Sequence, residues 1–405
     1  MISYLKAKSF INKISPLGTE EILPSKALKR VVAKDVISMA DAPPYDSSLK
    51  DGYAIYASCI KDASENNPVE LDVIASCFAG EQKRKVLPFG KAIKIMTGAV
   101  IPKGADAVLP QELTKEKGNN KVICLADTTP GRNILKKGVD VSFKEIICQK
   151  DTFLTPALLG LITGANVSKI NVYKLPKVAI IATGSELSDK ENGSVSGKIF
   201  PSNRATIAAW LEEFGIRSKL MLCGDDKNEL LQLVHKGLLE FDVVITSGGV
   251  LDGERDLVIS VMEQAGVEFL FRRAKIGPGK GVCMGVANNK LVFNLPGGPP
   301  SNYVAFIFIA LPAILRLSGF KSDFPPVISA TLTSTVKGRS DWTQFILSRT
   351  FFKGNAFWCE PVFEESRLKR IAFSNSVIIL DEGITKITKG QIAKVAMLDL
   401  IGTEM

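Results

Sequence analysis

Histidine is nearly absent from this sequence, which has one such residue, His235, among 405. It lies within residues 229–240, where leucines recur at helical spacing, so we interpret it as a residue on a helix surface. A Ser-His-Asp triad and a histidine-rich metal site are therefore disfavoured. Catalysis by this chain would have to use carboxylates, lysines, hydroxyls and backbone amides.

Paired cysteines are missing as well. The seven cysteines are scattered along the chain, none at CxxC spacing, and their number is odd. This pattern argues against a zinc ribbon and against a disulfide framework. Free thiols in a reducing compartment are the simplest interpretation, which predicts a cytoplasmic protein.

Long apolar runs are also lacking. No run approaches the roughly 20 residues that span a bilayer. The longest, residues 303–315, contains Pro312 and is expected to be a buried helix. The first 14 residues alternate lysines with apolar residues and lack the apolar stretch and cleavage site of a signal peptide. We expect neither a membrane segment nor a targeting leader.

The formal net charge is +9, which could indicate a nucleic-acid partner. The lysines are dispersed, however, and no arginine-rich stripe interleaved with aromatic residues is present. An anionic small molecule explains the charge as well, and so does solvation. We therefore expect small-molecule substrates and no nucleic acid.

Three composition patterns follow one another along the chain. Residues 46–140 contain short β-like runs separated by glycine and proline, which predicts a small β-rich domain. Residues 175–320 alternate helical patterns with apolar strands that lack alternation, as in a parallel sheet covered on both faces. Residues 324–405 contain alternating strands typical of a small antiparallel barrel or sandwich.

Three apolar strands of the middle segment run into glycine- and hydroxyl-rich loops, at residues 183–186, 246–249 and 295–301. Ligands of open parallel sheets bind beyond the carboxyl ends of the strands. Glycine lets the backbone approach a ligand, and the helix that follows each loop adds a positive dipole end. Any one loop could be a tight turn, but three together predict an anion cradle. Its residues would include Thr183, Gly184, Ser185, Ser247, Gly248, Gly249, Pro296, Gly297 and Ser301.

Carboxylates accompany these loops, notably Glu186 and Asp256. Acids beside a phosphate repel it unless a cation bridges them, and Mg²⁺ is the natural cation for carboxylate and phosphate oxygens. The alternative is that these acids cap the helices that follow. No Walker A sequence is present, because the segment around Lys280 lacks the required spacing.

Several motifs together resemble the molybdopterin molybdenumtransferase family, to which MoeA and the gephyrin E domain belong. Residues 43–54 (PPYDSSLKDGYA) are similar to its P-x-F-D-N-S-A-M-D-G-Y-A signature. Residues 95–112 resemble I-M-T-G-A…P-x-G-A-D-A-V…Q-E, and residues 131–140 resemble G-x-N-I…G-E-D. The three loops resemble T-G-[DS]-E-L, S-G-G-V-S-x-G-x-x-D and L-P-G-N-P-x-S, in the right order.

The resemblance implies a multidomain α/β plus β fold. Residues 1–45 and 141–175 would form an elongated helical linker domain, interrupted by an inserted β-rich domain at 46–140. Residues 176–323 would form a molybdopterin-binding-like α/β domain with a mostly parallel sheet, followed by a C-terminal β-barrel at 324–405. A homodimer is implied, with the site in a cleft between subunits.

The implied reaction is Mg²⁺-assisted insertion of molybdate into adenylylated molybdopterin, with release of AMP. Asp51, Thr97 and Asp140 would face the cleft from the other subunit, while Glu186 and Asp256 would handle metal and adenylate. Lys280, with Lys275 nearby, would hold molybdate. Pro296, Gly297, Ser301 and Ser366 would shape the pterin pocket. The adenylyltransferase of the pathway and molybdoenzyme acceptors are implied partners.

Departures from the family pattern cluster in the oxyanion half of the site. One lysine of K-P-G-K-P is Gly277, the acid of D-S-N is Pro201, and an arginine expected in the barrel is Leu347, with Arg349 two residues on. Loss of a cation weakens oxyanion binding. Two hypotheses remain open: an active transferase, for molybdate or for tungstate, and a non-catalytic paralogue that binds pterin or a partner protein as a scaffold.

Overall fold

The structure is a computed structural model, and it describes residues 1–81, 83–118, 120–184, 187, 199–248 and 255–399. The chain forms two compact units. Unit 1 comprises Met1–Glu20, Lys29–Ala33 and Val172–Met405, and unit 2 comprises Glu21–Leu28 and Lys34–Asn171. The chain crosses between the units four times, first within β1 (Thr19–Ile22) and last within β12 (Ile170–Tyr173).

A mixed six-stranded sheet dominates unit 2, in the order β7-β4-β6-β5-β9-β8. Side chains of one strand alternate between its two faces. Tyr53 and Ile55 therefore pack into one buried cluster and Ala54 into another, on the opposite face. The strands are β4 (Gly52–Ile55), β5 (Val69–Cys77), β6 (Lys91–Ile95), β7 (Ala107–Pro110), β8 (Thr114–Glu116) and β9 (Lys121–Cys124).

Smaller elements complete unit 2. Helix α2 (Pro156–Gly164) begins at Thr155, whose hydroxyl accepts the Leu158 N–H at 3.3 Å, and Pro156 stands at its first position, where no amide is needed. Ile162 is its one buried residue. The other elements are β2 (Val36–Ile37) paired with β11 (Ile146–Cys148), β3 (Ser47–Ser48) paired with β10 (Ile134–Leu135), and the short helices η1 (Pro24–Lys26), η2 (Ala57–Ile60) and η3 (Gln111–Leu113).

Unit 1 contains a six-stranded sheet in the order β14-β13-β15-β19-β18-β16. The first four strands are parallel, as the unalternating apolar runs predicted. Strand β18, which was not predicted, pairs antiparallel with β19 and with β16. The sheet is therefore mixed, with three of its five pairings parallel. The strands are β13 (Val178–Thr183), β14 (Ser218–Cys223), β15 (Val243–Ser247), β16 (Glu268–Phe271), β18 (Cys283–Ala287) and β19 (Lys290–Leu295).

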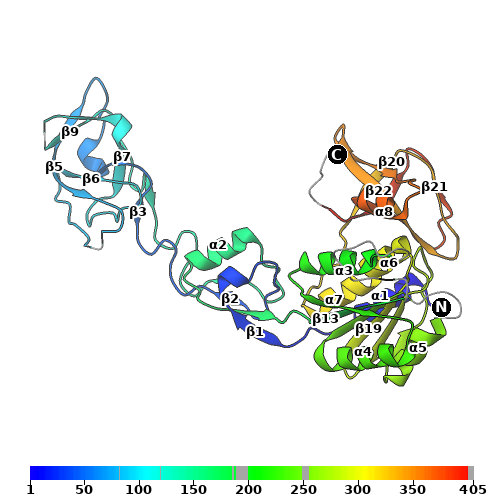
Figure 1. Ribbon diagram of the computed structural model, residues 1–405. Helices are drawn as coiled ribbons and strands as arrows, with labels where there is room; N and C mark the ends of the chain where they lie inside the picture. Colours follow the sequence, from blue (N-terminus) through cyan, green and yellow to red (C-terminus); the bar gives the residue numbers. More distant parts are fainter. Residues whose placement is uncertain (82, 119, 185–186, 188–198, 249–254, 400–405) are drawn as a thin grey trace. The chain divides into compact units, whose positions relative to one another are not determined.

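Helices cover both faces of this sheet (Figure 1). Ile180 and Ile245 face a cluster that includes residues of α1, α3 and α6 to α7, whereas Ala179 and Val244 face α4 and α5. Burial on both faces explains why these strands are apolar throughout. The helices are α1 (Tyr4–Ile11), α3 (Ser202–Glu212), α4 (Lys227–Glu240), α5 (Arg255–Gln264), α6 (Pro299–Ala305), η4 (Phe306–Ala310) and α7 (Leu311–Leu317).

The last three of these helices form one continuous helix, Pro299–Leu317. It is long and apolar enough to cross a membrane, but 78% of its most apolar stretch is buried inside the molecule. The prediction of a buried core helix is confirmed. The turn before Pro312 is a π-helix, Phe306–Ala310, which accommodates a residue that lacks an amide donor.

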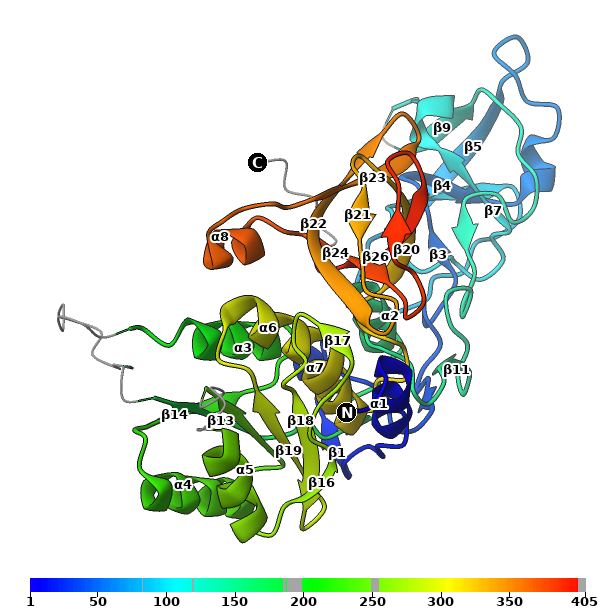
Figure 2. The same cartoon turned by 90° about the vertical axis from the view of Figure 1, so that its right-hand side faces the viewer.

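The C-terminal part of unit 1 is a closed barrel of five strands, in the order β22-β23-β20-β26-β24, with β22 and β24 closing it (Figure 2). Of the two predicted alternatives, a barrel or a sandwich, the structure is the barrel. The pairing of β20 with β23 is parallel, so the barrel is not purely antiparallel. The elements are β20 (Val327–Leu332), β22 (Thr343–Lys353), β23 (Ala356–Pro361), α8 (Arg367–Ala372), β24 (Ser376–Leu380) and β26 (Ile392–Met397).

Three short strands border the barrel. Strand β17 (Ile276–Gly277) runs parallel to the start of β22, where Ile276 lies opposite Thr343. Strand β21 (Val336–Lys337) pairs with β25 (Lys386–Ile387). The division into four domains at the boundaries given above stays a prediction.

Candidate functional site

The carboxyl ends of β13, β15 and β19 meet at one edge of the parallel sheet. The register places Ala182 opposite Ser247, and Ser247 opposite Leu295. The three loops that follow these strands therefore begin side by side, as expected for neighbouring parallel strands.

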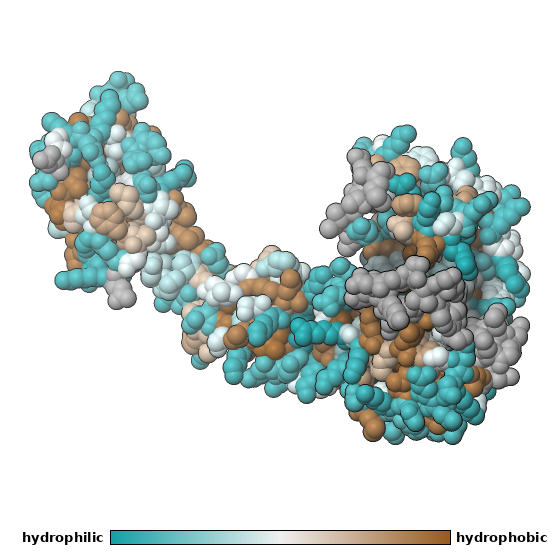
Figure 3. Space-filling view, in the orientation of Figure 1, coloured by the Kyte–Doolittle hydropathy of each residue, from teal (hydrophilic) through white to brown (hydrophobic). Residues whose placement is uncertain are grey.

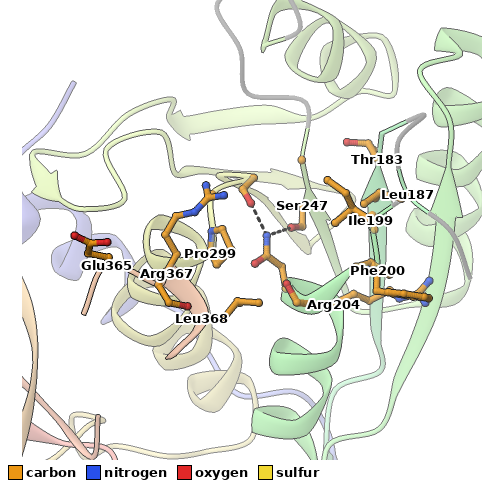
Figure 4. A pocket seen from close by; sticks show the side chains of 18 residues that line it. Thr183, Leu187, Ile199, Phe200, Arg204, Ser247, Pro299, Glu365, Arg367 and Leu368 are labelled. Atoms are coloured by element: carbon orange, nitrogen blue, oxygen red, sulfur yellow. Dashed lines mark hydrogen bonds between the residues drawn. The ribbon is translucent and has the colours of Figure 1, made fainter. Parts of the chain in front are cut away.

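A cavity of about 910 Å³ opens at this edge (Figure 4). Its described lining comes from the strand ends with their loops, from residues 199–204 at the start of α3, and from residues 365–368 at the start of α8. Among the predicted substrate-binding residues, five line it: Thr183, Ser247, Gly248, Gly297 and Ser366. The volume falls in the range typical of sites for small molecules and cofactors.

Two of the loops approach each other so closely that one position requires glycine. Gly248 has a φ of +118°, a backbone conformation that side chains disfavour. A Cβ atom placed on it would lie 2.3 Å from the carbonyl oxygen of Thr183. The glycine at the end of β15 is therefore explained by backbone crowding, in addition to any ligand.

Two asparagine side chains fasten the loops to the helices behind them. Asn302, which is buried, donates from Nδ2 to Ser247 Oγ at 2.9 Å and to the Pro296 carbonyl at 2.8 Å. Asn203 donates to the Gly297 carbonyl at 2.7 Å and lies 3.4 Å from Ser247 Oγ, as drawn in Figure 4. The positions of two loops thus depend on helices α3 and α6. Neither asparagine was predicted as a site residue.

Thr183, at the end of β13, carries a polar atom that needs a partner. It is 5% exposed, and its Oγ1 atom has no hydrogen-bond partner among the described residues. An unsatisfied buried hydroxyl costs free energy unless something binds it. Because Thr183 lines the cavity, this hydroxyl is available to a ligand bound there.

The cations at the cavity differ from those that the sequence suggested. Arg204 and Arg367 line it, whereas Lys275 and Lys280 do not. Lys275 forms an ion pair with Glu382 at 3.6 Å, and the Lys280 side chain is exposed. Sequence reasoning missed Arg367, although it directly follows Ser366, a residue singled out by the motif comparison.

The barrel position where the motif pattern places an arginine is Leu347, which is 4% exposed and packs into the main core of unit 1. Arg349 lies opposite Glu360 across strands β22 and β23. Neither residue lines the cavity.

The remaining predicted residues of unit 1 lie partly outside the cavity lining and partly outside what the structure describes. Pro296 and Ser301 are not part of the described cavity lining. The Pro296 carbonyl accepts from Asn302, and a Cβ atom added to Gly279 would lie 3.2 Å from the Ser301 carbonyl. Gly184 follows the end of β13, where its N–H donates to the Cys223 carbonyl at 3.1 Å. Four predictions fall on positions outside what the structure describes: Ser185, Glu186, Gly249 and the side chain of Asp256.

Unit 2 carries the other three predicted residues. Asp51 accepts two hydrogen bonds at Oδ1, from the Thr97 N–H and from the Thr97 hydroxyl, both at 2.7 Å. These bonds, the backbone one foremost, hold the pKa of Asp51 below its ordinary value, so the carboxylate stays ionised. Asp140 is exposed, and its N–H donates to the Ala42 carbonyl at 2.9 Å.

No group of three or more histidine, cysteine or acidic side chains that could hold a metal is found among the described residues. Thr183 Oγ1 is a described oxygen atom of the cavity wall that has no hydrogen-bond partner, and oxygen is the ligand type that Mg²⁺ prefers. The carboxylates of Glu186 and Asp256, the predicted metal ligands, lie outside what the structure describes.

A mixed α/β sheet with a loop-lined cavity at its parallel strand ends is typical of the class of α/β proteins that bind small ligands at strand ends. Hydroxyls, backbone groups and arginines line this cavity, and these groups suit an anion. Comparisons with known proteins sharpen this class. Residues 2–165 match the MoeA N-terminal region (domain I and II). Residues 179–316 match a probable molybdopterin binding domain.

Curated relatives and solved structures agree. The molybdopterin molybdenumtransferase of Staphylococcus aureus is 30% identical over 376 residues, 92% of this chain and 90% of its own. That of Staphylococcus epidermidis is 31% identical over 377 residues, with the same coverage of 92% and 90%. The molybdopterin biosynthesis MoeA protein of Pyrococcus horikoshii superposes with a TM-score of 0.81 at 28% identity, covering 98% of this chain and 100% of its own. The chain belongs to the molybdopterin molybdenumtransferase family, which is a family of transferases.

Proposed function

We propose that this protein inserts molybdate into adenylylated molybdopterin and releases AMP, as a step of molybdenum cofactor biosynthesis. The observation that carries the proposal is the cavity of about 910 Å³ at the parallel strand ends. It combines an orphaned hydroxyl, close-packed glycine loops and arginines in one place. These are the groups that bind phosphate and other oxyanions.

Each part of the cavity wall would have a distinct task. The hydroxyls of Thr183 and Ser247 would orient oxygen atoms of the substrate, and the backbone at Gly248 and Gly297 would admit it closely. Ser366 would complete the wall from the side of the barrel. Because the amides of Asn302 and Asn203 fix these loops, the groups would be in place before the substrate binds, which favours orientation.

Mg²⁺ would be held by oxygen ligands from Thr183, Glu186 and Asp256. When bound, it would neutralise phosphate charge and polarise the phosphoanhydride that is cleaved. The resemblance also implies that Lys280 is a cation for molybdate, but its exposed side chain is not part of the described cavity lining. Tungstate is the alternative oxyanion, since it has the same shape and charge.

A homodimer fits the surface of unit 2. Exposed apolar side chains gather near α2, β2 and β11. Figure 3 shows hydrophobic residues on the surface of this part of unit 2. Ile37 and Ile146 are cross-strand partners and are 47% and 51% exposed, and Met39 is 60% exposed. Exposed apolar clusters of this kind mark protein interfaces. We propose that a second copy of the chain covers them.

Sedimentation velocity would test this assembly. Ile37→Asp should shift the protein to the monomer, because a buried charge at an interface is unfavourable. The control is Ile74→Asp, which changes an isoleucine of unit 2 that is 46% exposed in strand β5. A dimer that survives Ile37→Asp, or a monomeric wild type, would count against the proposal.

The resemblance further implies that Asp51, Thr97 and Asp140 act on the cavity of the partner copy. Mixing Asp51→Asn with Glu186→Gln tests this directly. If each site takes residues from two copies, randomly mixed dimers regain about a quarter of the wild-type rate, since half are heterodimers with one intact site. No recovery after verified subunit exchange would refute a shared site.

A second function, binding without turnover, has one specific observation in its favour, because neither Lys275 nor Lys280 lines the cavity. A paralogue that holds the pterin, or a partner protein, as a scaffold would need no oxyanion cation. The adenylyltransferase of the pathway and molybdoenzyme acceptors are the partners that we propose for either function, in the cytoplasm.

The decisive experiment measures AMP release. Purified protein is mixed with adenylylated molybdopterin and Mg²⁺, with molybdate in one series and tungstate in another. Release that depends on one oxyanion is expected and identifies the metal. No release with either one would reject the transferase, and retained binding of the pterin nucleotide would then support the scaffold.

A further inference from the structure

The cavity carries one arginine whose charge has no described partner. Arg367 is the first residue of α8 and lines the cavity. Its guanidinium makes no hydrogen bond or ion pair with any residue that the structure describes. The other lining arginine, Arg204, already takes part in an interaction.

The chain fixes the start of α8, and with it the base of the Arg367 side chain. The Ser366 hydroxyl accepts the Lys369 N–H at 3.4 Å, and Arg370 donates from Nε to the Glu364 carbonyl at 2.8 Å. Helix α8 also packs against α6. Figure 4 shows the Arg367 side chain reaching from α8 past Pro299 toward the strand ends.

A second, independent observation points to a ligand in the same place. The buried Thr183 hydroxyl, which also lines the cavity, has no hydrogen-bond partner among the described residues. Two unsatisfied polar groups therefore border one space, one from the end of β13 and one from α8. The described lining contains two arginines, Arg204 and Arg367, and one acidic side chain, Glu365.

We propose that Arg367 binds a tetrahedral oxyanion group of the ligand in this cavity, either molybdate or tungstate, or the phosphate of the nucleotide. A guanidinium offers two parallel N–H donors, which match two oxygens of a tetrahedral anion. It supplies from the barrel the cation that Lys275, bound to Glu382, does not bring to the cavity. The inference rests on the proposed function for the identity of the ligand, but not for the presence of the anion site.

Isothermal titration calorimetry at fixed ionic strength would test the assignment with three probes: molybdate, tungstate and AMP. Arg367→Gln should weaken binding of at least one probe about tenfold or more, because a charge-assisted pair of hydrogen bonds is lost. Arg367→Lys should fall between, since it keeps the charge but not the fork. The matched control is Lys369→Gln, which removes the same charge from an exposed position of the same short helix, and it should change each affinity less than about twofold.

The outcomes separate the sources of the anion. Weakening for molybdate or tungstate alone assigns Arg367 to the metal oxyanion, and weakening for AMP alone assigns it to the phosphate. Unchanged affinities in Arg367→Gln, an equal loss in Lys369→Gln, or no binding of any probe by the wild type would overturn the proposal. If the wild type releases AMP and Arg367→Gln binds every probe as tightly as the wild type, this inference is refuted and the transferase function stands. If the wild type releases no AMP but Arg367→Gln binds a probe more weakly, the inference stands and the transferase function is refuted.

Discussion

Predicted site residues lie both at the strand-end edge of unit 1 and in the Asp51–Thr97 pair of unit 2. The hydrogen bonds that fix these residues differ between the two regions. At the edge, neutral groups are fixed by buried hydrogen bonds from Asn302 to Ser247 and to the Pro296 carbonyl. In unit 2, a carboxylate near the surface is fixed by two hydrogen bonds from a single threonine. We therefore expect substitutions at the strand-end edge to change both the geometry of the site and the free energy of unfolding. Substitutions at Asp51 should change the chemistry of the site with little effect on the free energy of unfolding.

Asp51→Asn should show the largest effect and the cleanest separation. The amide oxygen can still accept from Thr97, so the fold is kept, while the negative charge is lost. Turnover should fall by about two orders of magnitude or more, as when a positioned acid or base is removed. AMP release at saturating substrate measures it, alongside the thermal unfolding midpoint, which should fall much less than in Asn302→Leu, described below, because Asp51 lies near the surface.

The matched control for this variant is Asp127→Asn, an exposed aspartate of the same unit. It should leave turnover and stability as they are. A drop in the unfolding midpoint of Asp51→Asn as large as that of Asn302→Leu, or equal turnover in Asp51→Asn and Asp127→Asn, would break the contrast between the regions.

Asn302→Leu tests the coupling in unit 1. The leucine has a similar size but no donors, so the Ser247 hydroxyl and the Pro296 carbonyl lose a buried partner. Urea unfolding should show a loss of about 2–3 kcal/mol, because buried groups left unpaired cost free energy. AMP affinity should fall as well. Asn203→Ala, at a half-buried position, should cost about 1 kcal/mol. Equal losses of unfolding free energy in the two variants would show that burial of the asparagine does not determine the cost.

Gly248→Ala should be next in size. The added Cβ would meet the Thr183 carbonyl at a φ of +118°, which costs about 2 kcal/mol in strain. Gly298→Ala, in the neighbouring loop, is the comparison, since its Cβ would meet nothing within 4 Å. That variant should stay within about 0.5 kcal/mol of the wild type by urea unfolding. A tolerated alanine at 248 would refute the crowding argument.

Thr97→Val is the mildest change, and it acts through pH. A carboxylate with a lowered pKa contributes stability above its unfolded pKa and loses it as the pH falls through its folded pKa. Valine removes the hydroxyl donor but keeps the amide donor, so the pKa of Asp51 should rise toward its ordinary value. The acid limb of the turnover profile should then move to higher pH.

A carbon-13 NMR titration of the Asp51 carboxyl would measure this shift directly. Thr152→Val is the control, because the Thr152 hydroxyl donates to the Gln149 carbonyl and not to an acid. An unchanged or lowered pKa of Asp51 in Thr97→Val would show that the hydroxyl does not stabilise the carboxylate.

Much of the fold followed from local patterns. The unalternating apolar runs that became β13, β15 and β19 predicted parallel strands with both faces covered, and the glycine loops after them predicted a shared edge. Alternation in the C-terminal part predicted the barrel strands. These predictions succeeded because periodicity reports which faces of an element are buried, and glycine reports where the backbone turns or crowds.

Other features were missed by the sequence analysis. Strand β18 lies in the apolar run 282–287, which Gly285 interrupts, and it forms a tight hairpin with β19 and also pairs antiparallel with β16. The burial of Asn302 likewise depends on how α6 packs behind the loops. An asparagine in a helix is ordinary in a sequence, and its two hydrogen bonds exist only in the folded chain.

By itself the sequence determined the family, the sheet edge and the loops that border the cavity. The tertiary structure decided which cations reach that cavity. Lys275 is held by Glu382, a residue of the distant C-terminal segment, whereas Arg367 comes from that same segment to the rim. A sequence does not show where a charged side chain points. Packing between remote segments determines which charged side chain faces a ligand and which one faces another residue.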